Sequence, residues 1–505
     1  MEAPRTLTEA VTTSNGPVRG YHDDRLKVFK GLRYGAPPTG HARFKPPSPP
    51  QPWTEPAQAI AYGAPAIQSG LAPGERRTSP GDPPAPDEPA SSEDCLFLNV
   101  WTPGLDQPKR PVMVWLHGGG FANGSGGAAM YDGGNLARQG DTVLVTVNHR
   151  LNVFGYLHLG EVFGAEYAQS GVAGMLDIVQ ALEWVRDNIA AFGGDPANVT
   201  IFGESGGGWK VSLLMAMPAA RGLFHKAIIQ SGPGLTAKPM AEADKIARQL
   251  LAELGVTTPQ ALAALPTEAI SHASVKLPGE AMRLYTPVLD GKVIPRHPFE
   301  PDAAPLNADV PVLIGTNKDE NTLFLFSHPR FGAFDEADIA RQAEAAMGVR
   351  GPALVAALRT AFPDYNDTHL YAAVGTATGM WGNSVKLAER KAAQGRAPAY
   401  MYMLTWETPV AKGRLRSPHA VEIPLVFDNV EKARNFVGRG EGPEILARQM
   451  SAAWLAFART GAPNAPGLPK WPAYDAKTRA TMIFDLESRV QNDPLPEVRQ
   501  VLQAP

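Results

Sequence analysis

The residues with the strongest chemical signal are the turn G-E-S-G-G at 203–207, which presents a serine between two structured segments. The four residues before it, V-T-I-F from Val199, have the apolar character of a buried strand, and a Gly-rich helical stretch follows. Such a turn is sharp and lifts the hydroxyl above the edge of a sheet, which requires small residues at Gly203 and Gly207. We therefore predict that Ser205 is a nucleophile rather than part of an ordinary strand-to-helix connection.

A second Gly-rich segment, H-G-G-G-F at 117–121, follows another apolar run. A serine that attacks a carbonyl creates an oxyanion, which needs hydrogen-bond donors. The backbone amides of Gly119, Gly120 and Gly206 are the donors that we predict. A phosphate-binding loop is the alternative interpretation, but the sequence contains no G-x-x-x-x-G-K-[ST] and no clean G-x-G-x-x-G with a fitting acidic residue.

A base must accept the proton of the serine, and after a turn of this type the chain order is serine, acid, histidine. The candidate base is His419, in a polar loop after a predicted strand, although a loop histidine without a role is the alternative. The candidate acids are Asp319 and Glu320, which follow the run V-P-V-L-I-G-T-N, and spacing alone does not choose between them. The other histidines after the serine are His225, His272, His297, His328 and His369.

The elements that must position these residues alternate along the chain. Short apolar runs typical of buried parallel strands begin at Pro111, Thr142, Val199, Ala227, Val310, Tyr400 and Thr481. Between them, apolar residues recur with helical spacing at 174–192, 241–254, 384–393 and 444–459. This alternation predicts an α/β fold, with a large, mostly parallel central sheet that has helices on both faces.

The first hundred residues differ, because G-P-V-R-G-Y, L-K-V-F-K-G-L-R-Y and L-F-L-N-V-W have the character of antiparallel strands added before the parallel part. The Pro-rich segment 71–92 has no periodicity. We expect it to be an exposed loop, and a flap over an active site is the alternative. The length of 505 residues fits roughly three domains or one large α/β unit.

Composition excludes several classes of function. The net charge is −3, from 47 basic and 50 acidic residues, so neither a nucleic-acid groove nor a polybasic membrane surface is indicated. The single cysteine, Cys95, cannot form an internal disulfide, and the N-terminus lacks the apolar core of a signal peptide. The motifs H-x-x-H and H-E-x-x-H do not occur. We expect a soluble, cytoplasmic protein without a metal or other cofactor.

Five sequence blocks, in the same chain order, also occur in a known protein family. They are F-K-G-L-R-Y-G-A-P-P-T-G-H-A-R-F, S-E-D-C-L-F-L-N-V-W-T-P, H-G-G-G-F, G-E-S-G-G and G-T-N-K-D-E. With these blocks the chain resembles the type-B carboxylesterases, the cholinesterase-like α/β-hydrolases, from about residue 16 to about residue 485. The segment after the serine, G-G-G-W-K-V-S, is most similar to bacterial members such as p-nitrobenzyl esterases.

The resemblance implies one catalytic domain over 1–505, with Ser205 as nucleophile, Glu320 as acid and His419 as base. It implies hydrolysis of a small-molecule carboxylic ester through an acyl-enzyme. It also implies two structural ion pairs, Arg43 with Glu93 and Arg150 with Asp177.

The chain departs from the family pattern at three places. Gly206 replaces the usual alanine after the nucleophile, and Asn321 replaces the usual glycine after the acid. Cys95 is retained, but Ala66 stands where secreted relatives have its disulfide partner.

Two other functional hypotheses stay open at this point. The first is a non-catalytic binding protein, which the presence of all three candidate catalytic residues opposes. The second is an amidase, carbamate hydrolase or thioesterase that uses the same residues. We expect the substrate pocket to be formed by the loops 71–92, 279–285, 323–334 and 376–381. Tyr285, Phe324, Phe326 and Trp381 are the apolar candidates, and core packing is the alternative for any one of them.

Overall fold

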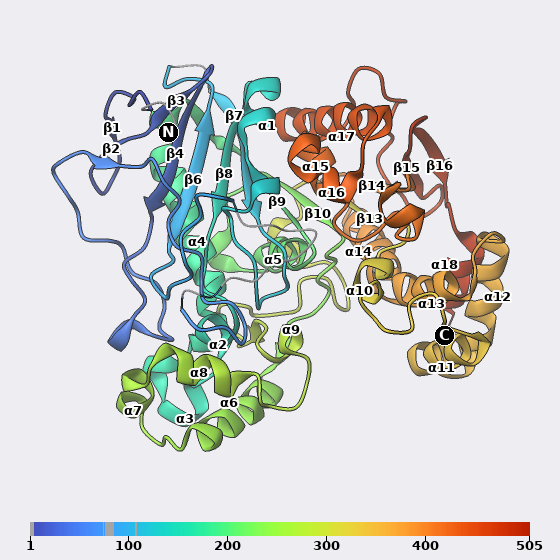
Figure 1. Ribbon diagram of the computed structural model, residues 1–505, viewed down its shortest axis with the longest axis horizontal. Coiled ribbons are helices and arrows are strands. Elements are labelled where there is room, and N and C mark those ends of the chain that lie inside the picture. Colours follow the sequence, from blue (N-terminus) through green and yellow to red (C-terminus); the bar gives the residue numbers. More distant parts are fainter. Residues whose placement is uncertain (1–4, 74, 76–84, 107–108, 505) are drawn as a thin grey trace. The chain divides into compact units, whose positions relative to one another are not determined.

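The computed structural model describes residues 5–73, 75, 85–106 and 109–504 (Figure 1). Its contacts divide the chain into two compact units. The first contains the residues up to Ala227 together with Gly234–Asn307, and the second contains Ile228–Pro233 and the residues from Ala308 onward. Of the predicted loop 71–92, residues 74 and 76–84 lie outside the described residues, and the remainder contains no helix or strand.

In the described residues, six strands of the large sheet lie entirely in the first unit. Their spatial order is β3 (Tyr21–Asp23), β4 (Leu26–Arg33), β6 (Phe97–Thr102), β8 (Val143–Val147), β7 (Arg110–Leu116) and β9 (Gly194–Glu204). Strand β7 is parallel to β8 and β9, whereas β3, β4 and β6 pair antiparallel with their neighbours. The predicted antiparallel start and parallel continuation are thus confirmed. The predicted strand at Pro17 is present as β2 (Pro17–Arg19), which pairs antiparallel with β1 (Val11–Thr12) in a separate small sheet that also contains β5 (Ala57–Gln58).

Helices cover both faces of this sheet. Helix α1 (Gly134–Gly140) connects β7 to β8, and α4 (Ala173–Asn188) precedes β9. Because β8 and β9 lie on opposite sides of β7, right-handed crossovers place α1 and α4 on opposite faces. The helix predicted over 174–192 is confirmed except for its last turn, which is a 3₁₀ turn that ends at Gly193 with φ +77°.

Further elements of the first unit surround the sheet. The helices are α2 (Asn152–Tyr156), α3 (Gly160–Phe163), α5 (Gly206–Leu214), α6 (Met240–Leu254), α7 (Pro259–Ala264), α8 (Thr267–Ser274) and α9 (Ala281–Leu284), and the strands β11 (Lys238–Pro239) and β12 (Val288–Leu289) form a small pair. Helices α3, α6, α7 and α8 gather in one cluster (Figure 1). Strand β10 (Lys226–Gln230) carries the chain from the first unit into the second.

The second unit contains three parallel strands, β13 (Val312–Asn317), β14 (Ala399–Leu404) and β15 (Ala480–Phe484). Strand β16 (Arg489–Asn492) pairs antiparallel with β15. The predicted helices at 384–393 and 444–459 correspond to α14 (Gly382–Ala393), which packs on β13 and β14, and α17 (Glu441–Thr460), which packs on α15 (Ile423–Val426). The strand and helix predictions for this unit are therefore confirmed within a few residues.

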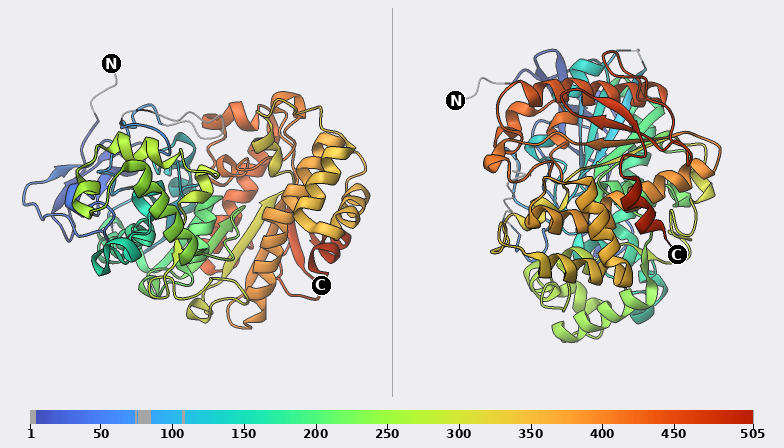
Figure 2. Two further views of the ribbon diagram at one scale, coloured as in Figure 1. Left: turned by 90° about the horizontal axis from the view of Figure 1, so that it is seen from below. Right: turned by 90° about the vertical axis from the view of Figure 1, so that its right-hand side faces the viewer.

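The sequence did not predict several helices of the second unit. They are α10 (Asn321–Leu325), α11 (Glu336–Met347), α12 (Gly351–Ala361), α13 (Asp367–Thr376), α16 (Arg434–Val437) and α18 (Pro496–Gln503). Figure 2 shows α11, α12, α13 and α18 grouped together, and α12 contacts both α11 and α18. None of the helices within the described ranges has the length and apolar character needed to cross a membrane.

Two buried ion pairs brace the first unit. Arg43 donates from Nε and Nη2 to the two carboxylate oxygens of Glu93, at 2.7 and 2.6 Å. Arg150 binds Asp177 in the same bidentate way, at 2.8 and 2.6 Å. Both pairs are those that the family resemblance implies. Cys95 is a buried free thiol, and burial raises its pKa well above the ordinary value.

Candidate active site

Ser205 occupies a strained turn between β9 and α5. Its φ of 54° and ψ of −122° are values that a non-glycine residue rarely adopts. The turn is packed against the end of β7, because a Cβ at Gly203 would lie 2.6 Å from Leu116 O and one at Gly207 only 2.0 Å from that atom. Only glycine fits at these two positions, which is the requirement that the sequence pattern predicts.

The Gly-rich loop after β7 lies directly against this turn. Gly119 and Gly120 have φ of +80° and +63°, which favour glycine. A Cβ at Gly206 would lie 2.2 Å from Gly120 O and 2.5 Å from its Cα, so the backbones of the loop and of the start of α5 are in contact. The three glycines predicted to supply oxyanion donors thus come together at the N-terminus of α5, where the helix dipole also favours negative charge.

The second unit holds His419 against a buried carboxylate. Glu320 follows β13 and is fully buried, and its Oε2 lies 2.5 Å from Nδ1 of His419. Its Oε1 accepts hydrogen bonds from the Ser231 hydroxyl at 2.6 Å and from the backbone N–H of Asn317 at 2.7 Å. A carboxylate held in this way fixes the tautomer of the imidazole and stabilises its protonated form.

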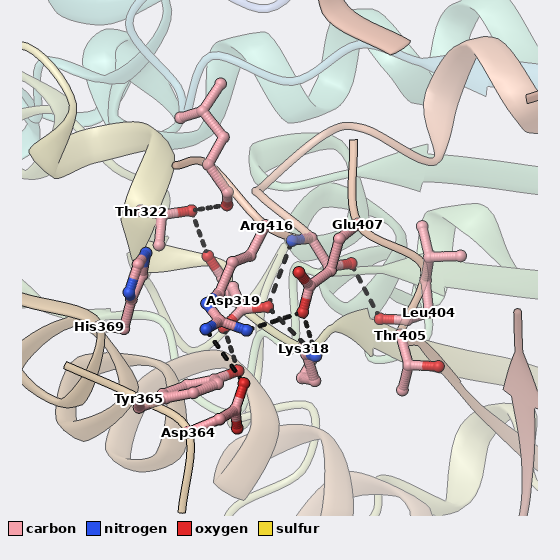
Figure 3. Close-up of polar contacts among 12 residues, drawn as sticks. Lys318, Asp319, Thr322, Asp364, Tyr365, His369, Leu404, Thr405, Glu407 and Arg416 are labelled. Atoms are coloured by element: carbon pink, nitrogen blue, oxygen red, sulfur yellow. Dashed lines mark hydrogen bonds and ion pairs between the residues drawn. The ribbon is translucent and has the colours of Figure 1, made fainter. Parts of the chain in front are cut away.

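Asp319, the other candidate acid, takes part in a different set of contacts (Figure 3). Its Oδ1 accepts a hydrogen bond from the Tyr365 hydroxyl, and its Oδ2 accepts one from the Ser417 backbone N–H at 3.2 Å. Lys318 Nζ lies 3.9 Å from Oδ2, and burial raises the pKa of Asp319 to about 6. Asp319 therefore connects the end of β13 to the segment before His419, whereas Glu320 contacts the imidazole of His419 itself.

A second buried carboxylate, Glu422, lies close to this pair. Asn317 donates from Nδ2 to Glu422 Oε2 at 2.6 Å and to Pro418 O at 2.8 Å, so it links the end of β13 to the histidine loop. Burial, reinforced by the nearby charge of Glu320, raises the pKa of Glu422 to about 7. The sequence analysis missed Ser231, Asn317 and Glu422, because their types and spacing carry no signal without the fold.

The predicted pocket residues divide into two groups. Tyr285 and Trp381 are buried core residues. Phe324 and Phe326 expose 48% and 40% of their surface, and the ring of Phe324 lies 4.8 Å from the imidazole of His419. Phe324 is therefore the candidate that an apolar group bound beside His419 would contact.

Among the described residues, the other histidines after Ser205 lack the carboxylate partner that a catalytic base of this type requires. In the part of the chain that the structure describes, none of His225, His272, His297, His328 and His369 forms an ion pair with a carboxylate. Within the described ranges of the chain, no group of three or more histidine, cysteine or acidic side chains lies close enough together to hold a metal ion.

Comparison with known proteins gives consistent matches over more than nine tenths of the chain. The model of the carboxylesterase family matches residues 7–501. The para-nitrobenzyl esterase of Bacillus subtilis (strain 168) is 35% identical over 506 residues, 98% of each chain. The phenmedipham hydrolase of Pseudarthrobacter oxydans is 33% identical over 93% of this chain and 94% of the hydrolase. A crystal structure of a Geobacillus stearothermophilus carboxylesterase at pH 6.2 is 38% identical, with a TM-score of 0.86 over 98% of this chain and 100% of that one.

Proposed function

The chain belongs to the carboxylesterase family and is a carboxylic ester hydrolase, and we propose that Ser205, Glu320 and His419 act as its catalytic triad. The observation that carries the proposal is the buried hydrogen bond between Glu320 and His419, at 2.5 Å. The strained turn at Ser205 and the chain order serine, acid, histidine support it. The match with carboxylesterase structures confirms the predicted α/β-hydrolase fold.

The proposed reaction proceeds through an acyl-enzyme. His419 accepts the proton of Ser205, and the alkoxide attacks the ester carbonyl. The backbone amides of Gly119, Gly120 and Gly206 stabilise the oxyanion of the tetrahedral intermediate. His419 then protonates the leaving alcohol, and a water molecule activated by the same imidazole hydrolyses the acyl-enzyme to release the carboxylic acid.

The substrate that we propose is a small-molecule ester with an apolar group. The exposed ring of Phe324 beside the imidazole supports an apolar contact near the reacting bond. We also propose that residues 1–505 form one catalytic domain, which the family match over 7–501 supports. A bacterial, cytoplasmic origin is supported by the likeness to bacterial esterases and by a single free cysteine.

Replacing the nucleophile tests the proposal. Ser205→Ala is expected to lower kcat for p-nitrophenyl butyrate by at least ~10³-fold, since removing a triad member costs several orders of magnitude. The far-UV circular dichroism spectrum of the variant serves as the control for folding. Retention of more than about 1% of the activity would contradict the assignment.

Carbamate hydrolysis is the second candidate function, because a phenmedipham hydrolase is 33% identical over most of the chain. The same triad would serve, with the carbamoyl group on Ser205 in place of the acyl group. Parallel kcat/KM values for a p-nitrophenyl ester, a carbamate and an anilide of matched size distinguish these functions. We expect the ester to be preferred.

A further inference from the structure

A lysine lies buried beneath the Gly-rich loop of the first unit. Lys210, on α5, has no exposed surface. Its Nζ donates hydrogen bonds to His117 O and to Gly120 O, both at 2.9 Å, and lies 5.3 Å from the centre of the Phe121 ring. Neither the sequence motifs nor the proposed mechanism gives this side chain a role.

The two carbonyls that Lys210 binds belong to particular peptide groups of the loop. His117 O lies on the peptide group that joins His117 to Gly118, and Gly120 O lies on the one that joins Gly120 to Phe121. Between them are only two peptide groups, and these carry the N–H groups of Gly119 and Gly120. One ammonium group therefore holds the backbone on both sides of the two proposed oxyanion donors.

This loop needs an external restraint. Gly119 and Gly120 are consecutive glycines with positive φ, and glycine has the largest conformational freedom of any residue. A mispositioned donor loses most of its value, because oxyanion donors act only when they already point to where the charge develops. A lysine on a helix that begins beside the nucleophile fixes the loop relative to Ser205 within the same unit.

The surroundings of Lys210 also show that its burial is costly. An unpaired buried ammonium is unfavourable, and burial lowers the pKa of Lys210 to about 7, although the charge of Glu204 opposes this shift. The stacked rings of His117 and His149, 4.9 Å apart, have lowered pKa values because of burial and the lysine charge. A buried charge of this kind is weak evidence of a stabilising role, so the contacts of Lys210 with the loop are the better guide to its function.

We propose that Lys210 is a positioning residue of the oxyanion hole, which sets the orientation of the Gly119 and Gly120 amides through its hydrogen bonds to His117 O and Gly120 O. The inference rests on the proposed function, since it assumes that these amides bind the oxyanion. Lys210 acts through the loop and does not itself contact the substrate.

The test compares Lys210→Met with Lys226→Met. Lys226 is a second buried lysine of the first unit, but it binds the side chain of Asn198 rather than the Gly-rich loop. With p-nitrophenyl butyrate, and with active sites counted by titration with an organophosphate, Lys210→Met is expected to lower kcat per site by about 10–100-fold and to change KM by less than about 3-fold. The inhibition constant of an alkyl trifluoromethyl ketone, which forms a tetrahedral adduct, should rise in parallel. Lys226→Met should leave all three quantities within about 2-fold.

A purely structural role gives a different result. It would reduce the number of titratable sites or the Tm while kcat per site stays within about 2-fold of the wild type, and this outcome overturns the proposal. If Lys210→Met does not fold, Lys210→Leu, which also lacks a hydrogen-bond donor, replaces it, and unchanged kcat per site then has the same meaning. Failure of the proposed function is recognised separately, because Ser205→Ala would then remain active whatever the lysine variants do.

Discussion

The Ser205 region and the Glu320–His419 region are held together by different kinds of contact. The first is made of backbone, in which Gly203 and Gly207 touch the end of β7 and Gly206 touches Gly120. The second is made of side chains from distant parts of the sequence, held by hydrogen bonds around one buried carboxylate. A site built from backbone leaves a strict local sequence pattern, because only glycine permits the close approaches. A site built from side-chain contacts leaves almost none.

The two regions should therefore fail in different ways. The backbone-built region is sensitive to added atoms, since even one methyl group at a contact glycine meets another main chain. The side-chain region is sensitive to lost charge or lost hydrogen bonds, since its groups are buried and polar.

The largest difference is expected between the two neighbouring carboxylates. Glu320→Gln should lower kcat at least ~10²-fold with KM nearly unchanged, because an amide neither holds the imidazole tautomer nor stabilises the imidazolium. Asp319→Asn should cost much less, because Asp319 binds Tyr365 and Ser417 rather than His419. Steady-state kinetics on an ester substrate measure both effects. A larger loss for Asp319→Asn would mean that the acid is misassigned.

Adding one methyl group tests the backbone-built region. Gly206→Ala introduces the residue usual in the family, yet here its Cβ would lie 2.2 Å from Gly120 O. The loop must shift, so we expect kcat to fall about 10-fold, while KM changes little. Gly222→Ala is a matched control for the added methyl group, since Gly222 has open space around it, although its φ of +79° adds some strain. Unchanged kcat for Gly206→Ala would show that the loop adapts without cost to the oxyanion hole.

The raised pKa of Glu422 makes the stability of the side-chain region depend on pH. Native Glu422 stays protonated up to about pH 7, whereas in the unfolded chain it ionises near its ordinary value of 4.5. The native state binds more protons between these values, so this group lowers the free energy of unfolding as pH rises from 4.5 to 7, by up to about 3 kcal/mol. In Glu422→Gln the decrease in Tm from pH 5 to pH 8 should be smaller than in the wild type by a few degrees. An equal decrease in both proteins would mean that Glu422 is ionised in the native state.

Removal of metal ions is expected to have the smallest effect on activity. The proposed mechanism uses only side chains and backbone amides of the two regions, so incubation with EDTA should leave kcat/KM unchanged. Inhibition that added zinc or calcium reverses would require a different mechanism.

The sequence predicted most of what local pattern determines. The strands β7, β8, β13, β14 and β15 are buried along their length, and β9 is buried from Val199 onward, so these segments appear as continuous apolar runs. Helix α11 went unpredicted although its N-terminus has a readable signal, the capping box of Asp335 and Asp338. The strand at Pro17 was predicted but its partners β1 and β5 were not, because a three-residue strand carries no information about its partners.

The choice between Asp319 and Glu320 could not be made from local pattern. Both carboxylates are buried and follow the same strand, and only their contacts with residues about 50 to 100 positions away distinguish them. The family resemblance implied Glu320, and the structure pairs Glu320 with His419.

The central claim, that Ser205 is the nucleophile, is tested most directly by covalent labelling. The enzyme is treated with a fluorophosphonate, residual esterase activity is followed, and the modified peptide is identified by mass spectrometry. We expect one phosphonyl group per chain, located on Ser205, with activity lost in proportion to labelling and no labelling of Ser205→Ala. Complete inhibition with the label on another residue, or full activity of a protein labelled at Ser205, would contradict the account.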